Sequence, residues 1–177
     1  MGFIDYQMAR SEFKDDKFML QIIDCLKDDD SFHLLRNGAE DANLPFDTPN
    51  EQYKNWMTVC DGGLLFSTTL LSLNEYDEML DLSFSTLDEY NTQERRSSYE
   101  LPSDYRIIAI LNYGDPICVS QLDSRVYLWD SQERKTSTVW ETFADFLADE
   151  YNIAAQMIEE EVLEPIPMKS GEEQYVE

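Results

Sequence analysis

The residues that could carry nucleophilic or metal chemistry are few, because the chain has one histidine and three cysteines. His33 would have to serve any Ser–His or Cys–His pair, and no serine or cysteine motif lies beside it. Cys25, Cys60 and Cys118 are widely spaced and form no Cys-x-x-Cys pair, a pattern that favours reduced, partly buried thiols over a zinc site or a disulfide framework. We expect His33 to be structural, and we expect no catalytic residue, metal or cofactor.

The remaining motifs favour structural roles. Gly62-Gly63 is a lone pair, and the six glycines of the chain cannot supply a phosphate-binding loop. The run Asp28-Asp29-Asp30 lacks the spacing of a calcium loop and is typical of a solvated helix end. Asp115 stands before a proline, which favours a turn. Carboxylate pairs for acid–base catalysis could be drawn almost anywhere among 37 acids, so they carry no information.

The charge balance is the unusual feature of the composition. Asp and Glu number 37 against 13 Lys and Arg, which gives a formal net charge of -24. Nucleic acids and anionic membranes require clustered basic residues, so neither is expected as a partner. The acidity favours a basic protein partner, a cation, or solubility alone. The sequence has no apolar run of membrane-spanning length and no secretory signal pattern, so we expect a cytoplasmic protein.

The acidic residues are unevenly distributed. Residues 55–94 contain no Lys or Arg but eight acids, with large apolar side chains between them. Such a mixture is expected of a surface that docks on a basic protein, with Tyr76 or Tyr90 as an aromatic anchor. The opposing interpretation is that the apolar groups are core and the acids are simply solvated. The candidate partner-binding residues are Glu75, Tyr76, Asp77, Glu78, Asp81, Asp88, Glu89 and Tyr90. Residues 159–164 and the acidic tail form a second, weaker candidate.

Helical periodicity predicts two helices in the first third of the chain. Apolar residues recur at helical spacing over 14–27, and Asp28 to Asp30 mark the end of this helix. A polar loop through Asn37-Gly38 is expected to follow. A second helix is expected to start at a capping box formed by Thr48 and Glu51 and to stop at Gly62-Gly63.

The rest of the chain alternates between strand and helix signals. We expect a strand over 64–71, a weak helix over 86–96, and an antiparallel meander of three strands over 105–111, 116–119 and 125–129. Helix is expected again from Thr138, with an apolar stripe of Val139, Trp140, Phe143, Phe146 and Leu147, and it should continue through 153–163. The prediction is one α+β domain over 1–164, its antiparallel sheet covered mainly on one face, and an acidic mobile tail at 165–177.

Short motifs stand in a characteristic order along residues 44–150. The first half contains Leu44-Pro45, then Tyr53 and Trp56, then Asp61-Gly62-Gly63-Leu64-Leu65-Phe66. The second half contains Leu101-Pro102-Ser103-Asp104-Tyr105, Ile107 to Leu111, Tyr113 to Val119, Val126 to Asp130, and Phe143 to Leu147. Their order and spacing resemble the SUKH superfamily, which comprises fungal cell-wall-assembly regulators and many bacterial relatives. The first 43 residues and the Glu-rich end beyond Tyr151 depart from the family pattern.

The resemblance implies a central, strongly curved antiparallel sheet flanked by N- and C-terminal helices. It also implies a non-enzymatic role, since most bacterial members look like immunity proteins that neutralise a cognate polymorphic or contact-dependent toxin, often a nuclease. An acidic inhibitor suits a nuclease toxin, whose substrate groove must be positive. Two alternatives stay open: a scaffold or regulatory adaptor like the fungal relatives, and an acidic DNA mimic. The identity of the partner and the oligomeric state stay open as well.

Overall fold

The helices and strands combine into an α+β fold. The computed structural model describes residues 2–38 and 42–157. Their helices are α1 (Tyr6–Glu12), α2 (Lys17–Asp28), the 3-10 turn η1 (Asp30–Phe32), α3 (Glu51–Val59), α4 (Leu87–Tyr90), α5 (Gln93–Tyr99) and α6 (Phe143–Met157). Their strands are β1 (Leu34–Asn37), β2 (Cys60–Leu65), β3 (Thr68–Leu70), β4 (Tyr76–Asp77), β5 (Leu82–Ser83), β6 (Tyr105–Ile110), β7 (Pro116–Ser120), β8 (Val126–Asp130) and β9 (Lys135–Trp140).

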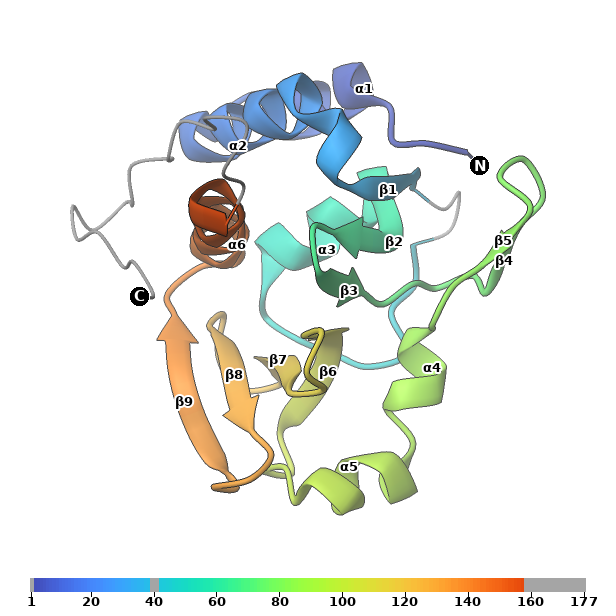
Figure 1. The fold of residues 1–177 in the computed structure, drawn as a ribbon. Helices are drawn as coiled ribbons and strands as arrows, with labels where there is room; N and C mark the ends of the chain where they lie inside the picture. The colour runs from blue at the N-terminus through green and yellow to red at the C-terminus, as the bar shows by residue number, and fades with distance from the viewer. Residues whose placement is uncertain (1, 39–41, 158–177) are drawn as a thin grey trace.

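A seven-stranded antiparallel sheet forms the centre of the fold. Its strand order is β1-β2-β3-β6-β7-β8-β9, and β4 with β5 forms a separate two-stranded hairpin. The N-terminal helices α1 and α2 and the last described helix α6 flank this sheet (Figure 1). The expected fold class is therefore confirmed. The antiparallel meander is also confirmed, and the structure extends it by a fourth strand, β9.

The sheet is covered most completely at its middle. All five residues of β7 are buried, so both faces of this strand are shielded. Helices α3 and α6 contact each other at one side of the fold, and α4 packs against β6 at another. The edge strand β9 instead alternates exposed and partly buried residues. Coverage of the sheet is thus two-sided at its centre and falls away toward this edge.

The first long helix agrees with its prediction, but a short helix before it was missed. Helix α2 begins after Asp16, whose carboxylate accepts the Met19 N–H, and ends at Asp28 as expected. Its buried face carries the predicted periodic residues. Helix α1 gives little periodic signal because only Ala9 is buried, and the side chain of Asp5 caps it.

The predicted capping box at Thr48 is wrong. Asn50 is the N-cap of α3, and its side-chain oxygen accepts the Tyr53 N–H at 3.0 Å. The hydroxyl of Thr48 donates instead to the Ser120 carbonyl at 2.6 Å, which fastens the approach to α3 onto the end of β7. The helix buries Tyr53 and Trp56, the two aromatic residues of its motif.

Gly62-Gly63 does not stop a helix but lies inside strand β2. A Cβ on Gly63, whose φ is +127°, would lie 2.1 Å from the Leu34 carbonyl oxygen of β1. The glycines therefore permit a close approach between two strands. The predicted strand over 64–71 is in fact the end of β2, a turn at Phe66, and β3. The predicted polar loop through Asn37 proves to include strand β1.

The region predicted as one helix from Thr138 begins as strand β9. Trp140 ends this strand with its ring packed 5.2 Å from that of Phe146, and α6 starts only at Phe143. Four members of the apolar stripe are core, as expected, namely Trp140, Phe143, Phe146 and Leu147, but Val139 on β9 is exposed, and the stripe spans a strand and a helix. The weak helix over 86–96 is two short helices, each capped by a threonine at Thr86 or Thr92. The predictions for 158–164 and for the 165–177 tail lie outside the described residues.

One continuous hydrophobic core joins the N-terminal helices to the sheet. It includes Ile4 and Phe13 from the first residues together with Trp56, Ile117 and Phe146 from later elements. Helix α2 contacts α6, and α1 contacts both α2 and α3. Residues 2–38 are therefore an integral layer of the same fold. Within the described residues, no helix is both long and apolar enough to cross a membrane.

Candidate partner-binding surface

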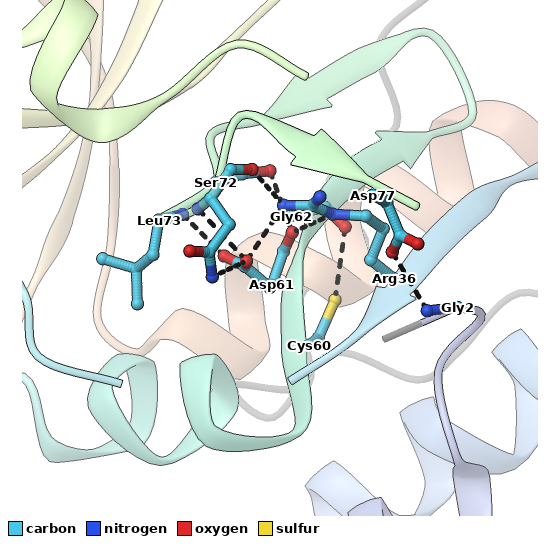
Figure 2. A network of polar contacts seen from close by, with 9 residues as sticks. Gly2, Arg36, Cys60, Asp61, Gly62, Ser72, Leu73 and Asp77 are labelled. Carbon is cyan, nitrogen blue, oxygen red and sulfur yellow. Dashed lines mark hydrogen bonds and ion pairs between the residues drawn. The ribbon is translucent and has the colours of Figure 1, made fainter. Parts of the chain in front are cut away.

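A buried ion pair, Arg36–Asp61, lies next to the acidic segment that contains the candidate residues from Glu75 onward. The Arg36 guanidinium on β1 lies 2.9 Å from the Asp61 carboxylate on β2, and neither side chain is exposed. Arg36 also donates to the main-chain carbonyls of Asp61, at 3.0 Å, and of Asn74. The guanidinium carbon of Arg36 lies over the ring of Phe84, 4.1 Å from the ring centre, in a cation–π contact. Figure 2 shows the polar contacts between Arg36 and Asp61.

Asp61 in turn orders the chain that leads into the acidic region. Its carboxylate accepts the Leu73 N–H at 2.6 Å and both the backbone and side-chain N–H groups of Asn74 at 3.2 and 3.0 Å. The Ser72 hydroxyl donates to the Asp61 carbonyl at 2.8 Å (Figure 2). Residues 72–74 are therefore fixed to the main sheet by hydrogen bonds, and those from Leu73 and Asn74 to the carboxylate are charge-assisted.

The next residues form the β4–β5 hairpin, which projects from the edge of the fold beside the N-terminus (Figure 1). Tyr76 pairs with Ser83 and Asp77 with Leu82, around a four-residue loop. Asp81 closes that loop with a φ of +51°. The Tyr76 hydroxyl donates to the Asp81 carboxylate, and this hydrogen bond raises the pKa of Tyr76.

Asp77 has a structural role that its sequence context did not reveal. Its side chain is buried and accepts hydrogen bonds from the backbone N–H groups of Gly2, Met79 and Leu80, at 3.0, 3.0 and 3.2 Å. Burial alone would raise the pKa of Asp77, but these donors and the charge of Arg36 outweigh it and lower that pKa. The prediction that Asp77 belongs to the exposed acidic face is therefore wrong.

The other hairpin residues are exposed and mix charge with apolar area. Met79 is 75% exposed, Tyr76 50% and Leu82 42%. Glu75, Glu78 and Asp81 are exposed among them. Gly2 lies against the side chain of Met79, so the N-terminal segment borders the hairpin. This surface, comprising Glu75, Tyr76, Glu78, Met79, Asp81 and Leu82, is called the hairpin surface below.

Helix α4 carries the remaining candidates. Asp88 and Glu89 are exposed in its first turn, and Tyr90 is half-buried. The guanidinium carbon of Arg95 lies 4.4 Å from the centre of the Tyr90 ring, so one face of that ring is occupied. Tyr90 is therefore less available as an aromatic anchor than Tyr76. Strand β5 and α4 are separated by only three residues, and Ser72 pairs with Thr86 in a parallel bridge.

The histidine and the two buried cysteines that could have carried nucleophilic or metal chemistry lie in environments typical of structural residues. His33 Nε2 lies 2.6 Å from the Leu26 carbonyl oxygen, and burial lowers the pKa of its half-buried ring. Cys60 and Cys118 are fully buried, and burial raises the pKa of both thiols, which keeps them protonated. Within residues 2–38 and 42–157, no group of three or more His, Cys, Asp or Glu could hold a metal ion.

Sequence reasoning missed the contributions of Arg36, Gly2 and Asp77 to this region. The run Leu34 to Asn37 gave no sign that its arginine would be buried. The partners of Arg36 lie 25 and 38 residues away along the chain, and Gly2 lies 75 residues from Asp77. Only the preference of acids for backbone N–H groups in loops could have suggested a structural role for one aspartate of the hairpin.

Comparison with known proteins identifies the fold. Searches of curated proteins and of solved structures found no match for the chain. A family model, that of the SMI1/KNR4 family (SUKH-1), matches residues 49–149. This segment runs from the approach to α3 into α6, so it includes β2 to β9 and the hairpin surface. The match covers more than half of the chain, and the chain therefore belongs to the SMI1/KNR4 family (SUKH-1) of the SUKH superfamily.

Proposed function

We propose that this protein is a non-enzymatic binding module, an immunity protein that neutralises a cognate bacterial polymorphic or contact-dependent toxin by stoichiometric binding. Membership of the SUKH-1 family supports a binding role, since most bacterial members of the SUKH superfamily look like immunity proteins. The observation that carries the proposal is the hairpin surface, where three exposed apolar side chains stand among three exposed carboxylates.

The composition of the hairpin surface suits a basic protein partner. Exposed aromatic and methionine side chains supply apolar contact area at interfaces, while charged residues around them guide association. The net charge of -24 adds a long-range attraction for a positively charged domain. A nuclease toxin carries such a positive surface because it must hold phosphates. A toxin of this class is therefore the proposed partner.

The anchoring of the hairpin supports the same proposal. The Asp77 carboxylate, which accepts hydrogen bonds from Gly2 and Met79, holds the hairpin itself, and the Arg36–Asp61 pair holds the residues that lead into it. A surface that is already ordered loses less conformational entropy when it binds. Preorganisation favours tight binding, which an inhibitor of a lethal enzyme requires.

The experiment is to co-express the full chain with the toxin domain encoded beside its gene and to measure their complex. We expect a one-to-one complex that abolishes the toxin activity and dissociates more readily at high salt. Immobilised full chain exposed to a low-salt lysate of the source organism is the second arm. Retention of several unrelated partners, with no toxin encoded nearby, would contradict the proposal and favour the adaptor function.

A further inference from the structure

A surface pocket away from the hairpin surface has the features of a binding site. A pocket of about 580 Å³ opens between the C-terminal end of α5, the β6–β7 turn and the β8–β9 turn. Its lining includes two tyrosines, Tyr99 and Tyr113, and two aspartates, Asp115 and Asp130. No lysine or arginine belongs to this lining in the described part of the chain. The pocket is therefore both aromatic and negatively charged.

The walls of the pocket are held in place by contacts between distant elements. Asp115 in the β6–β7 turn accepts the Ser131 N–H at 3.1 Å, which joins that turn to the β8–β9 turn. Tyr99 is fixed at its backbone, where its carbonyl accepts the indole N–H of Trp129 at 2.9 Å. The Tyr99 hydroxyl reaches the Gly114 carbonyl at 3.5 Å. The aromatic and acidic groups thus face a shared space without needing a ligand to assemble them.

Several polar groups that line the pocket have hydrogen-bonding positions that no described residue occupies. Asp115 and Asp130 each use one carboxylate oxygen, Oδ1, for backbone N–H groups, and their Oδ2 atoms accept no hydrogen bond from the described residues. The hydroxyl oxygen of Ser131 is shielded from solvent and has no partner there either. Tyr113 is 67% exposed and presents its ring. Burial, followed by the charges of Asp115, Glu150 and Asp130, raises the pKa of Tyr113, so its ring stays uncharged.

This combination selects a particular ligand chemistry. Carboxylate oxygens attract a cation, and tyrosine rings favour a flat cation that can lie against them. A guanidinium group satisfies both, because it donates hydrogen bonds in its plane while its face stacks on a ring. The protein already contains this arrangement at Arg36, which lies against Phe84 and donates to Asp61. The geometry points to a pocket that binds the guanidinium group of an arginine side chain presented by another protein.

The proposed ligand is an arginine within a polypeptide. Free arginine carries an α-ammonium and an α-carboxylate, whose interactions with the two aspartates oppose each other. An arginine in a chain carries neither group, so it brings only the guanidinium charge, and the open pocket admits a side chain that protrudes from a partner. Recognition of an arginine by the pocket does not depend on the proposed function. Only the identity of the protein that supplies the arginine rests on it, since a basic toxin is rich in such side chains.

The test is a titration of the full chain, labelled with ¹⁵N, with N-acetyl-L-argininamide, followed by NMR. We expect saturable chemical-shift changes confined to the pocket, at residues 113–115 and 131–132. N-acetyl-L-citrullinamide has nearly the same shape without the charge, and it should cause no saturable change. Free L-arginine has the same guanidinium group and net charge, with opposed charges on its α-ammonium and α-carboxylate, and it should bind no more tightly than N-acetyl-L-argininamide.

Two variants and one control separate the pocket from general acidity. Tyr113→Ala should weaken the binding of N-acetyl-L-argininamide about threefold, because the ring face is lost. Asp115→Asn combined with Asp130→Asn should abolish it, while the amide oxygens can still accept the backbone N–H groups of both turns. Leu122→Ala removes another exposed side chain, 79% exposed and away from the pocket lining, and should leave binding unchanged.

Three results would overturn the inference. Shift changes spread over the hairpin surface as well as the pocket would show a general attraction to an acidic protein. Equal effects of the citrulline and arginine probes would show that the guanidinium charge is not recognised. Tighter binding of free L-arginine would assign the pocket to a small molecule instead of a protein. A chain that binds the arginine probe in the pocket but no basic toxin would refute the proposed function and leave the pocket inference standing.

Discussion

Arg36 and Asp61 form an ion pair between neighbouring strands at a place where neither side chain reaches solvent. Their backbone segments are antiparallel neighbours, β1 and β2, yet the pair also holds residues 72–74, which lie beyond the next strand. Isolated charges in a protein interior are unfavourable, so each partner depends on the other. The pair therefore couples the edge of the sheet to the segment that presents the hairpin surface.

Removing the Asp61 carboxylate should strongly destabilise the protein. Asp61→Ala leaves the Arg36 charge buried without its partner and leaves the Leu73 N–H without an acceptor. We expect the free energy of unfolding to fall by about 3–5 kcal/mol, measured by urea denaturation. The matched control is Asp24→Ala, which breaks the exposed Arg10–Asp24 pair and should cost at most about 1 kcal/mol. Similar losses for both variants would contradict the role given to the buried pair.

The close approach of β1 and β2 predicts a difference between two glycine substitutions. Gly63→Ala would place a methyl group 2.1 Å from the Leu34 carbonyl oxygen, so the strands must separate. Gly114 also has a positive φ, +98°, but a Cβ there meets nothing within 4 Å. Gly114→Ala should cost about 1 kcal/mol of stability from backbone strain alone. Gly63→Ala should lower the melting temperature much further, and equal shifts would argue against the steric explanation.

Glu150 predicts a pH dependence that a single substitution should remove. Its side chain on α6 accepts a hydrogen bond from the Thr68 hydroxyl at 2.6 Å. Burial raises the pKa of Glu150 from 4.5 to about 7, against the opposing effect of that hydrogen bond. Because folding favours the protonated carboxyl, the stability that this group supplies is complete below about pH 4.5 and is lost as the pH rises through about 7.

Glu150→Gln cannot ionise and should therefore escape this loss. At pH 8 we expect the variant to exceed the natural chain in stability, by an amount on the order of 3 kcal/mol. Near pH 4 the two proteins should be nearly equal, because Glu150 is then protonated. Urea denaturation at a series of pH values measures both limits. Stability curves that stay parallel between pH 4 and pH 8 would show that Glu150 does not titrate in this range.

The fold class was predictable because its main signals are local. The strands β6 to β8 consist of apolar runs separated by turn residues, and α2 has a clear helical period. Strand β9 was missed because the large residues Val139 and Trp140, with Phe143 after them, mimic one helical stripe. Tertiary packing, which the local sequence does not show, places Trp140 at the end of β9, where its ring contacts Phe146 of α6.

The candidate site was predictable only in part, for a related reason. The lack of basic residues over 55–94 located an acidic segment correctly, and most of its acids are exposed. Composition could not separate Asp77, which is buried, from Glu78 beside it, which is exposed. The local N–H groups of Met79 and Leu80 account for part of the distinction, and the N–H of Gly2, which reaches Asp77 only in the folded chain, accounts for the rest. Pairing between residues far apart in sequence leaves no trace in local composition.

The hairpin surface predicts a specific effect of charge reversal on binding of the toxin domain. Glu75 and Glu78 are exposed, and their side chains make no hydrogen bond or ion pair with the described residues, so Glu75→Lys with Glu78→Lys should leave folding intact. We expect the association rate to fall about tenfold at low ionic strength, because electrostatic guidance is lost at the contact itself. Added salt should narrow the difference by screening it.

The control for that variant changes the net charge equally at another place. Glu12→Lys with Asp15→Lys alters exposed residues at the end of α1 and just beyond it, outside the hairpin surface. If the hairpin surface is the contact, this pair should slow association far less than the Glu75 and Glu78 pair, as measured by stopped-flow or surface plasmon resonance. Equal slowing by both pairs would mean that net charge alone guides the toxin. If Glu75→Lys with Glu78→Lys does not slow association, the contact lies on another face. Asp77 is not substituted in this test because its side chain is buried.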